Sequence, residues 1–203
     1  MSVEHVEVLV EEPSMEAALS LLLPRLLGDL SFAVYSHQCK EQLLARLPGR
    51  LQGYGSWLPG NWRILVIVDR DDDDCRALKA KLDKMARDAG FITGLGVQND
   101  CRRVVNRVAI EELEAWYFGD WEAVLAAYPR VPASVPRRKS FRDPDGIRGT
   151  WESLERIMQR AGYFKGGLRK IEAAREIAKH WEPARNKSRS FRAFHDAVQK
   201  MAE

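Results

Sequence analysis

The sequence predicts an α/β fold in which a mainly parallel sheet is flanked by helices. Apolar segments of strand length alternate with segments whose apolar residues recur at helical spacing, which is typical of a parallel sheet. The run Ile64–Val68 is entirely apolar and mostly β-branched, as in strands buried on both faces, and it leads directly into the acidic residues Asp69 to Asp74. We therefore expect this strand in the middle of the sheet.

The other elements are predicted in order along the chain. Further strands are expected at the short apolar runs 5–10, 30–36 and 104–110. Helices are expected where apolar residues recur every three or four positions, at 15–27, 40–51, 73–89, 111–118, 120–128, 151–162, 168–180 and 190–201. Ser14 is a candidate N-cap, Pro48-Gly49 should mark the weak end of the second helix, and residues 53–61 should form a loop.

Composition divides the chain into two parts. Residues 1–136 carry 15 basic and 20 acidic side chains, a net charge of −5, whereas residues 137–203 carry 17 and 9, a net charge of +8. Together with three prolines between 129 and 136, this indicates an α/β metal-binding domain at 1–128 and a basic helical extension, packed on it, at 129–203. The charge split suits a metal-dependent enzyme that acts on a polyanion. The alternative is that the basic helices serve only solubility.

Several classes of protein are disfavoured. No apolar run approaches membrane-spanning length and the first residues do not resemble a signal peptide, so we expect a cytoplasmic protein without membrane contact. The cysteines Cys39, Cys75 and Cys101 are scattered and odd in number, which indicates reduced thiols. The four histidines lack paired ligand spacing, and no serine or cysteine triad stands out, so covalent catalysis is not indicated.

Carboxylates follow the predicted strands. Glu11 follows the first strand, and Asp69 and Asp71 follow the central one. Ligands of open α/β sheets lie beyond the carboxyl ends of strands, and acids two residues apart in extended chain can share a cation. Like charges at this density are costly unless a metal or a basic ligand neutralises them. The sequence therefore predicts a Mg²⁺ or Mn²⁺ site with one or two ions.

Two further groups of acidic residues are either metal ligands or acids at the start of a helix. Asp73 fits the third acidic position of a calcium-binding EF-hand loop, but that reading fails because Asp74 replaces the required glycine and Ala80 the required glutamate. Asp72 to Asp74 are then favoured as acids at a helix start, although Asp73 remains a candidate ligand. Glu112 and Glu114, after a later strand, are candidate ligands too. Their alternative role, like that of Glu16, is as favourable partners of a helix N-terminus.

Two basic segments could contact phosphate. The segment 162–170 contains glycines that let backbone N–H groups approach an anion, although it lacks the spacing of a phosphate-binding loop. The segment 185–191 is polar and basic, and its alternative role is a loop and N-cap before the last helix. The candidate nucleic-acid-binding residues are Lys165, Arg169, Lys170, Arg185, Asn186, Ser188 and Ser190.

Four phrases resemble a known domain. Val-Glu-Glu-Pro-Ser-Met-Glu, Asp-Arg-Asp-x-Asp-Asp-Cys, Glu-Leu-Glu-Ala-Trp and Asn-x-Ser-x-Ser-Phe are similar to a small bacterial Toprim-like family known only as a domain of unknown function. The Toprim domain occurs in topoisomerases, primases and the overcoming-lysogenization-defect (OLD) nucleases. The similarity covers essentially the whole chain.

The resemblance implies roles for particular residues. Glu11 corresponds to the Toprim glutamate, and Asp69 and Asp71 to its paired aspartates. Glu112 and Glu114 resemble the additional acidic motif of the two-metal OLD nucleases, and Lys165 or Lys170 their downstream lysine. The sequence departs from the pattern at Glu12, where Toprim domains usually have glycine, and at Glu16, which stands one residue from the expected second glutamate.

These observations lead to two functional hypotheses. The first is a Mg²⁺-dependent Toprim-fold phosphodiesterase or nuclease that acts on nucleic acid, DNA rather than RNA. Glu11, Asp69, Asp71, Glu114 and a lysine at 165 or 170 would carry the chemistry. The second is a non-catalytic subunit of a two-component, defence-type system, which binds nucleic acid or a partner. The chain lacks a Walker motif, so any ATP dependence would come from a separate ATPase partner. Phosphotransfer through Asp69 is a poorer third reading, because it leaves Glu112 and Glu114 unexplained.

Overall fold

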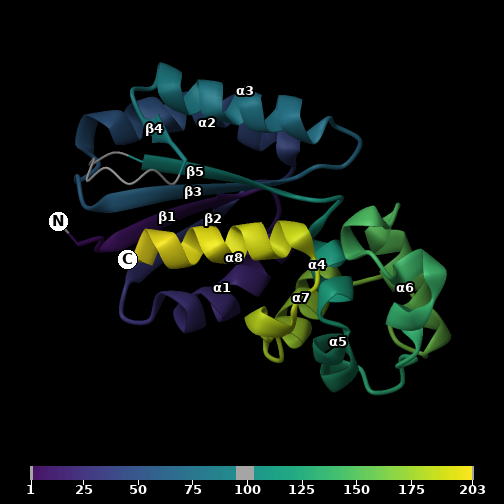
Figure 1. Cartoon of the computed structure of the whole chain (residues 1–203). Coiled ribbons are helices and arrows are strands. Elements are labelled where there is room, and N and C mark those ends of the chain that lie inside the picture. Colours follow the sequence, from purple (N-terminus) through teal and green to yellow (C-terminus); the bar gives the residue numbers. More distant parts are fainter. Residues whose placement is uncertain (1, 95–102, 203) are drawn as a thin grey trace.

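The computed structural model describes residues 2–94 and 103–202, and its centre is a five-stranded sheet in which all paired strands are parallel. From edge to edge the order is β2 (Ser31–Ser36), β1 (His5–Val10), β3 (Trp62–Asp69), β5 (Arg103–Ala109) and β4 (Ile92–Thr93). Helices cover both faces of the sheet (Figure 1). The predicted α/β class with a parallel sheet is confirmed, and the arrangement is consistent with a Toprim-like fold.

β3 lies in the middle of the sheet, as its sequence predicts. Ile64–Val68 are fully buried, and the strand pairs with β1 on one side and β5 on the other. Helices on both faces shield these five residues from water, which explains the unbroken apolar run. In register, Val10 lies opposite Ile67, and Ala109 lies opposite Asp69. The residues that follow β1, β3 and β5 therefore lie along one edge of the sheet.

The two faces of the sheet carry different helices. Alternate residues of β1 point to opposite sides, so Val8 packs with α1 (Pro13–Leu27), whereas Leu9 packs with α2 (Lys40–Trp57) and α3 (Cys75–Asp88). α8 (Arg189–Ala202) lies on the same face as α1 (Figure 1). No helix in residues 2–94 and 103–202 combines the length and the apolar character that crossing a membrane requires.

The second half of the chain joins the core on the α1 face. Its remaining helices are α4 (Leu113–Gly119), α5 (Trp121–Ala127), α6 (Thr150–Arg160) and α7 (Lys170–Ala178). Short 3-10 turns lie at Val135–Arg137, Lys139–Phe141, Pro144–Gly146 and Pro183–Arg185. Trp116 of α4 is fully buried against Phe191 and Phe194 of α8, with ring centroids 5.3 and 5.0 Å away. The helices after residue 129 thus share one apolar core with α1, and a division at 128/129 stays a prediction.

The structure corrects three local predictions. α2 continues through Pro48 to Trp57, so the loop expected from residue 53 starts later. Burial of Leu51 and Tyr54 on the helix's inner face compensates for the backbone hydrogen bond that the proline removes. α1 begins at Pro13 with Glu12 at the N-cap in place of Ser14. The two-residue strand β4 was not expected, because so short a segment has no periodicity.

Candidate active site

Three strand ends bring carboxylates together at one edge of the sheet. Glu11 follows β1, and its Oε2 accepts a hydrogen bond of 3.0 Å from the backbone N–H of Asp69 at the end of β3. The residues that follow β3 remain bonded to those that follow β5, because the N–H of Asp71 donates to the Glu111 carbonyl over 2.9 Å. Glu114 follows in the first turn of α4. The predicted placement of these acids at a common edge is thus observed.

Two of these carboxylates are buried without full compensation. Asp69 is 4% exposed and Glu114 is 1% exposed. Within the described residues, Asp69 Oδ1 and Glu114 Oε2 have no hydrogen-bond partner. Burying an unpaired carboxylate oxygen is unfavourable by a few kcal/mol or more. Either a proton or a bound cation must therefore compensate these two oxygens, or the folded state is less stable because of them.

The pKa values of the acids reflect this burial. Burial raises the pKa of Glu11 to about 7, and it raises the pKa of Glu114 to about 7 as well. Burial, followed by repulsion from Glu11, Glu12 and Glu114, raises the pKa of Asp69 well above its ordinary value. Because these carboxylates oppose one another's ionisation, they belong to one electrostatic cluster. We call Glu11, Glu12, Asp69 and Glu114 the carboxylate cluster.

Without a cation, the protein should lose stability as the pH rises from about 5 to 8. Glu114 has an ordinary pKa of 4.5 and a folded pKa of about 7, so the folded chain binds more protons than the unfolded chain between these values. The resulting stabilisation is fully present below pH 4.5 and is lost as the pH rises through 7. For Glu114 it is on the order of 3 kcal/mol.

Thermal unfolding in EDTA at pH 5.5 and pH 8 checks this expectation. Mg²⁺ should raise the unfolding temperature more at pH 8 than at pH 5.5, because protons and cations compete for the same oxygens. A cation-free protein that is equally stable or more stable at pH 8 would show that these carboxyls are not protonated in the fold.

Lys170 is the lysine that faces the carboxylate cluster. Its Nζ lies 3.6 Å from Glu12 Oε2 and 5.6 Å from the ring centroid of Trp151. Burial alone would lower the pKa of Lys170, but the combined attraction of the surrounding carboxylates, Glu114 and Glu12 foremost, raises it, so Lys170 remains charged. Lys165 is exposed and makes no ion pair within the described residues. A hollow of about 660 Å³ is lined by Glu12 and Lys170, so both can be reached from solvent.

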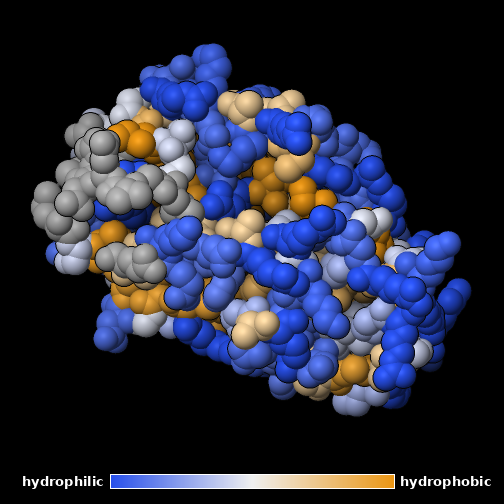
Figure 2. Space-filling model, in the orientation of Figure 1, coloured by the Kyte–Doolittle hydropathy of each residue, from blue (hydrophilic) through white to orange (hydrophobic). Residues whose placement is uncertain are grey.

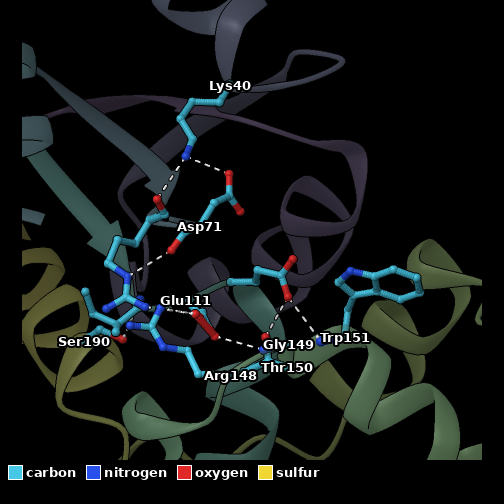
Figure 3. A network of polar contacts seen from close by, with 11 residues as sticks. Lys40, Asp71, Glu111, Arg148, Gly149, Thr150, Trp151 and Ser190 are labelled. Carbon is cyan, nitrogen blue, oxygen red and sulfur yellow. Dashed lines mark hydrogen bonds and ion pairs between the residues drawn. The ribbon is translucent and has the colours of Figure 1, made fainter. Parts of the chain in front are cut away.

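Lys40 is a charged residue of this edge that sequence reasoning missed. It begins α2, its side chain is 7% exposed, and its Nζ contacts Asp71 Oδ2 at 2.6 Å and Asp73 Oδ2 at 2.9 Å. It also donates to the carbonyl of Arg70 over 3.0 Å, as part of the network in Figure 3. Two of the candidate metal ligands are thus held by an internal ammonium group.

The sequence feature that could have indicated Lys40 is its position shortly after a predicted strand. The end of β2 lies at the same edge as the ends of β1 and β3, so a lysine that starts the next helix can reach acids on the neighbouring loop. Among those acids, Asp74 caps α3 by accepting a 2.7 Å hydrogen bond from the N–H of Ala77. This matches the alternative reading of the acidic run as helix-start residues.

Glu111 and Glu112 tie the start of α4 to the first residues of α6 and to the segment before it (Figure 3). Glu111 contacts Arg70 at 2.9 Å and Arg148 at 2.8 Å. Glu112 Oε2 accepts hydrogen bonds from Thr150 Oγ1 over 2.7 Å and from the N–H of Trp151 over 3.1 Å. The structure therefore places the predicted ligand Glu112 at the N-terminus of α6, where one of its oxygens is already occupied.

Most of the predicted contacts of segment 185–191 with nucleic acid do not fit the structure. Asn186, Ser188 and Ser190 are buried. Asn186 donates to the carbonyl of Trp116 over 2.9 Å, and both serines bind the carboxylate of Asp145. Ser188 also caps α8, which is the alternative role that the sequence allowed. Spacing alone could not show that these polar side chains point inward.

Arg185 and Arg169 are engaged by acids of the chain itself. Arg185 binds the buried carboxylate of Asp120 with two nitrogens, at 2.6 and 3.0 Å. Arg169 pairs with Glu172 at 2.9 Å on the exposed surface of α7. The carboxylate of Glu16 accepts a hydrogen bond from Ser36, and its backbone N–H donates to the carbonyl of Glu12 over 3.3 Å in the first turn of α1. Cys101 lies outside the described residues.

The carboxylate cluster suits a hard divalent cation by its chemistry. Carboxylate oxygens are the ligands that Mg²⁺ and Mn²⁺ prefer, and two of them are buried and unpartnered here. As the side chains stand, however, no three His, Cys, Asp or Glu residues within 2–94 and 103–202 are grouped so that they could hold a metal ion. Binding would have to draw a third carboxylate towards Asp69 and Glu114. Glu11 is the candidate, because it already contacts the backbone of Asp69.

The fold and this edge define an all-parallel α/β protein with buried, uncompensated acids at the carboxyl ends of its strands. Residues 10–199 match the family model described as Domain of unknown function (DUF4276), and the chain belongs to that family. No curated protein and no solved structure matches the chain.

Proposed function

We propose that this protein is a divalent-cation-dependent phosphodiesterase that cleaves nucleic acid. The observation that supports it most is the pair of buried carboxylates, Asp69 and Glu114, which each keep one oxygen without a partner at the carboxyl edge of the sheet. Such an edge is where α/β proteins bind ligands. Lys170 adds a positive charge that is open to solvent beside the acids.

In this proposal Asp69, Glu11 and Glu114 hold Mg²⁺ or Mn²⁺. The bound cation would supply Lewis-acid stabilisation of phosphate charge and a more acidic water. Without a cation the pKa values of Glu11 and Glu114 are about 7, so protons and the cation would compete for these oxygens near neutral pH. Lys170 would bind a non-bridging phosphate oxygen from the side of the 660 Å³ hollow and stabilise charge in the transition state.

The proposal includes a relationship to Toprim domains. Under this relationship, Glu11 after β1 and the Asp69-x-Asp71 pair at the end of β3 would correspond to the acids of that domain. Two features weigh against carrying over the two-metal site of the OLD nucleases. Glu112 is committed to α6, and Asp71 is bound by Lys40. Lys40 also binds Asp73, so we assign one cation to the carboxylate cluster and none to Glu112, Asp71 or Asp73.

A cleavage assay tests the proposed activity. Purified protein is incubated with end-labelled single-stranded DNA, duplex DNA and RNA in Mg²⁺, in Mn²⁺ and in EDTA. We expect cleavage that requires the cation and is absent in EDTA. Binding of these substrates without cleavage in any cation would contradict the assignment as an enzyme.

A non-catalytic subunit is the second candidate, and the internal pairing of Lys40 favours it. Lys40 compensates part of the charge of the acidic loop by contacting Asp71 and Asp73, so these two carboxylates depend less on a metal. Such a subunit would bind nucleic acid or a partner, for example a separate ATPase. This candidate predicts no cleavage even when Mn²⁺ is present together with an ATPase, if a neighbouring gene encodes one.

A further inference from the structure

The chain between α5 and α6 carries a dense group of exposed cations that none of the candidate sites includes. Between residues 137 and 148 these are Arg137, Arg138, Lys139, Arg142 and Arg148. The segment before and at the start of α8 adds Lys187, Arg189 and Arg192, which are also exposed. We call these two groups together the basic face. Figure 2 shows a largely hydrophilic surface on the right of the molecule, where Figure 1 places α6.

Contacts between the two segments place these cations on one surface. Asp143 pairs with Arg189 at 3.1 Å, and Asp145 accepts hydrogen bonds from Ser188 and Ser190. Arg137 and Lys187 line the same hollow of about 310 Å³. The two segments are therefore joined in the fold, although about 40 residues separate them in the sequence.

The positive charge of the basic face is mostly uncompensated. Residues 137–148 and 187–192 contain eight Lys and Arg residues but only two acids, Asp143 and Asp145. Asp145 is occupied by the two serine hydroxyls, Asp143 pairs with Arg189, and outside the two segments Glu111 pairs with Arg148. In the described part of the chain, Arg137, Arg138 and Lys139 make no ion pair. Like charges at this density repel one another unless an anion binds.

The backbone that carries these cations is anchored. Val135 and Ile147 are buried in the core on either side of the segment. Between them, the ring of Phe141 stacks on Phe118 of α4, with centroids 5.2 Å apart and planes 9° apart. Arg142 Nε also donates to the Arg137 carbonyl over 3.2 Å. The cations thus project from an ordered frame, so less entropy is lost when they bind an extended anion.

The basic face adjoins the candidate active site. Arg148 contacts Glu111 at 2.8 Å (Figure 3), and the backbone carbonyl of Glu111 accepts a hydrogen bond from the N–H of Asp71. Glu111 therefore links Arg148, the last cation of segment 137–148, to the acidic edge of the sheet. A polyanion that lies on the basic face can be continuous with the carboxylate cluster.

We propose that the basic face binds the phosphate backbone of a nucleic acid and leads the strand to the carboxylate cluster; the choice of nucleic acid rests on the proposed function. A membrane surface is the other common polyanionic partner, and it is disfavoured. Peripheral membrane segments combine basic residues with large apolar side chains that enter the lipid. The large apolar side chains that are exposed in the described residues lie elsewhere in the chain, at Leu21, Tyr35, Trp57, Ile92 and Ile171.

Fluorescence anisotropy with labelled 20-nucleotide single-stranded and duplex DNA, in EDTA, tests the proposal without involving catalysis. The triple variant Arg137→Gln, Arg138→Gln, Lys139→Gln should bind at least about tenfold more weakly at low salt. For this variant, the slope of log Kd plotted against the logarithm of the salt concentration should fall by roughly one unit for each phosphate group that it no longer binds. The control triple, Lys81→Gln, Arg87→Gln, Lys200→Gln, removes the same charge from exposed positions on α3 and α8 and should bind like the parent.

The outcomes separate this proposal from the proposed activity. The proposal that the basic face binds nucleic acid is wrong if the parent protein binds no DNA at low salt. It is also wrong if the basic-face variant binds DNA as well as the control variant does. Binding to anionic vesicles in preference to DNA also overturns it. If DNA binding depends on the basic face but the protein cleaves no substrate, the proposed role of the basic face is supported and the proposed phosphodiesterase activity is contradicted. Circular dichroism of both triple variants confirms that they are folded.

Discussion

The substitution Asp69→Asn is expected to raise the unfolding temperature in EDTA at pH 8 while it abolishes cation-dependent cleavage. Asp69 is buried, has an unpartnered oxygen and is repelled by Glu11, Glu12 and Glu114, so removing its charge relieves repulsion in the cation-free protein. The same change removes a direct ligand. Without a metal that stabilises phosphate charge, the rate should be roughly 10³-fold lower or more.

Asp72→Asn is the matched control for this experiment. Asp72 belongs to the same acidic run but is exposed, and it makes no hydrogen bond or ion pair in the described residues. The control should cleave, bind Mn²⁺ and unfold like the parent. If Asp69→Asn destabilises the cation-free protein, the carboxylate has a compensating partner and the central premise is wrong. If it retains parental cleavage, Asp69 is not a ligand.

The second large effect is expected for Glu114→Gln. Glu114 is the most deeply buried member of the carboxylate cluster, and its pKa of about 7 shows that its charge is not fully compensated by Lys170. Glutamine keeps the size of the side chain but cannot ionise. We expect cleavage to fall about 100-fold and the loss of stability between pH 5.5 and pH 8 to become smaller. Binding of DNA should be kept or improved, because repulsion of phosphate falls.

Glu122→Gln separates this effect from a general response to losing an acid. Glu122 lies in the first turn of α5, as Glu114 lies in the first turn of α4, but its side chain is 71% exposed. Its replacement should change neither cleavage nor the pH dependence of stability. A Glu114→Gln protein that cleaves as fast as the parent in both Mg²⁺ and Mn²⁺ would exclude Glu114 from the metal site.

The position of the acids could be predicted from the sequence because it follows from topology. An unbroken apolar run predicted the central strand, and parallel strands place their carboxyl ends at one edge. Glu11, Asp69 and Glu114 each come within five residues of a strand end, so their convergence needed no knowledge of side-chain contacts.

The partners of those acids could not be predicted in the same way. Lys40 is 31 residues from Asp71 in sequence, and Glu112 meets Thr150 across 38 residues. Asn186, Ser188 and Ser190 have the composition of an exposed loop, yet Asp145 and Trp116 hold them inside. Periodicity indicates which face of an element is buried, but not which polar side chain meets a buried partner.

The most direct test of the carboxylate cluster is a crystal structure of the protein soaked in Mn²⁺, with anomalous data collected near the manganese edge. We predict an anomalous peak roughly 2.0–2.3 Å from Asp69 Oδ1, with Glu11 and Glu114 as further ligands and Lys170 beside it. A peak only at exposed acids such as Asp72, or no peak at the carboxyl ends of β1 and β3, would contradict this assignment.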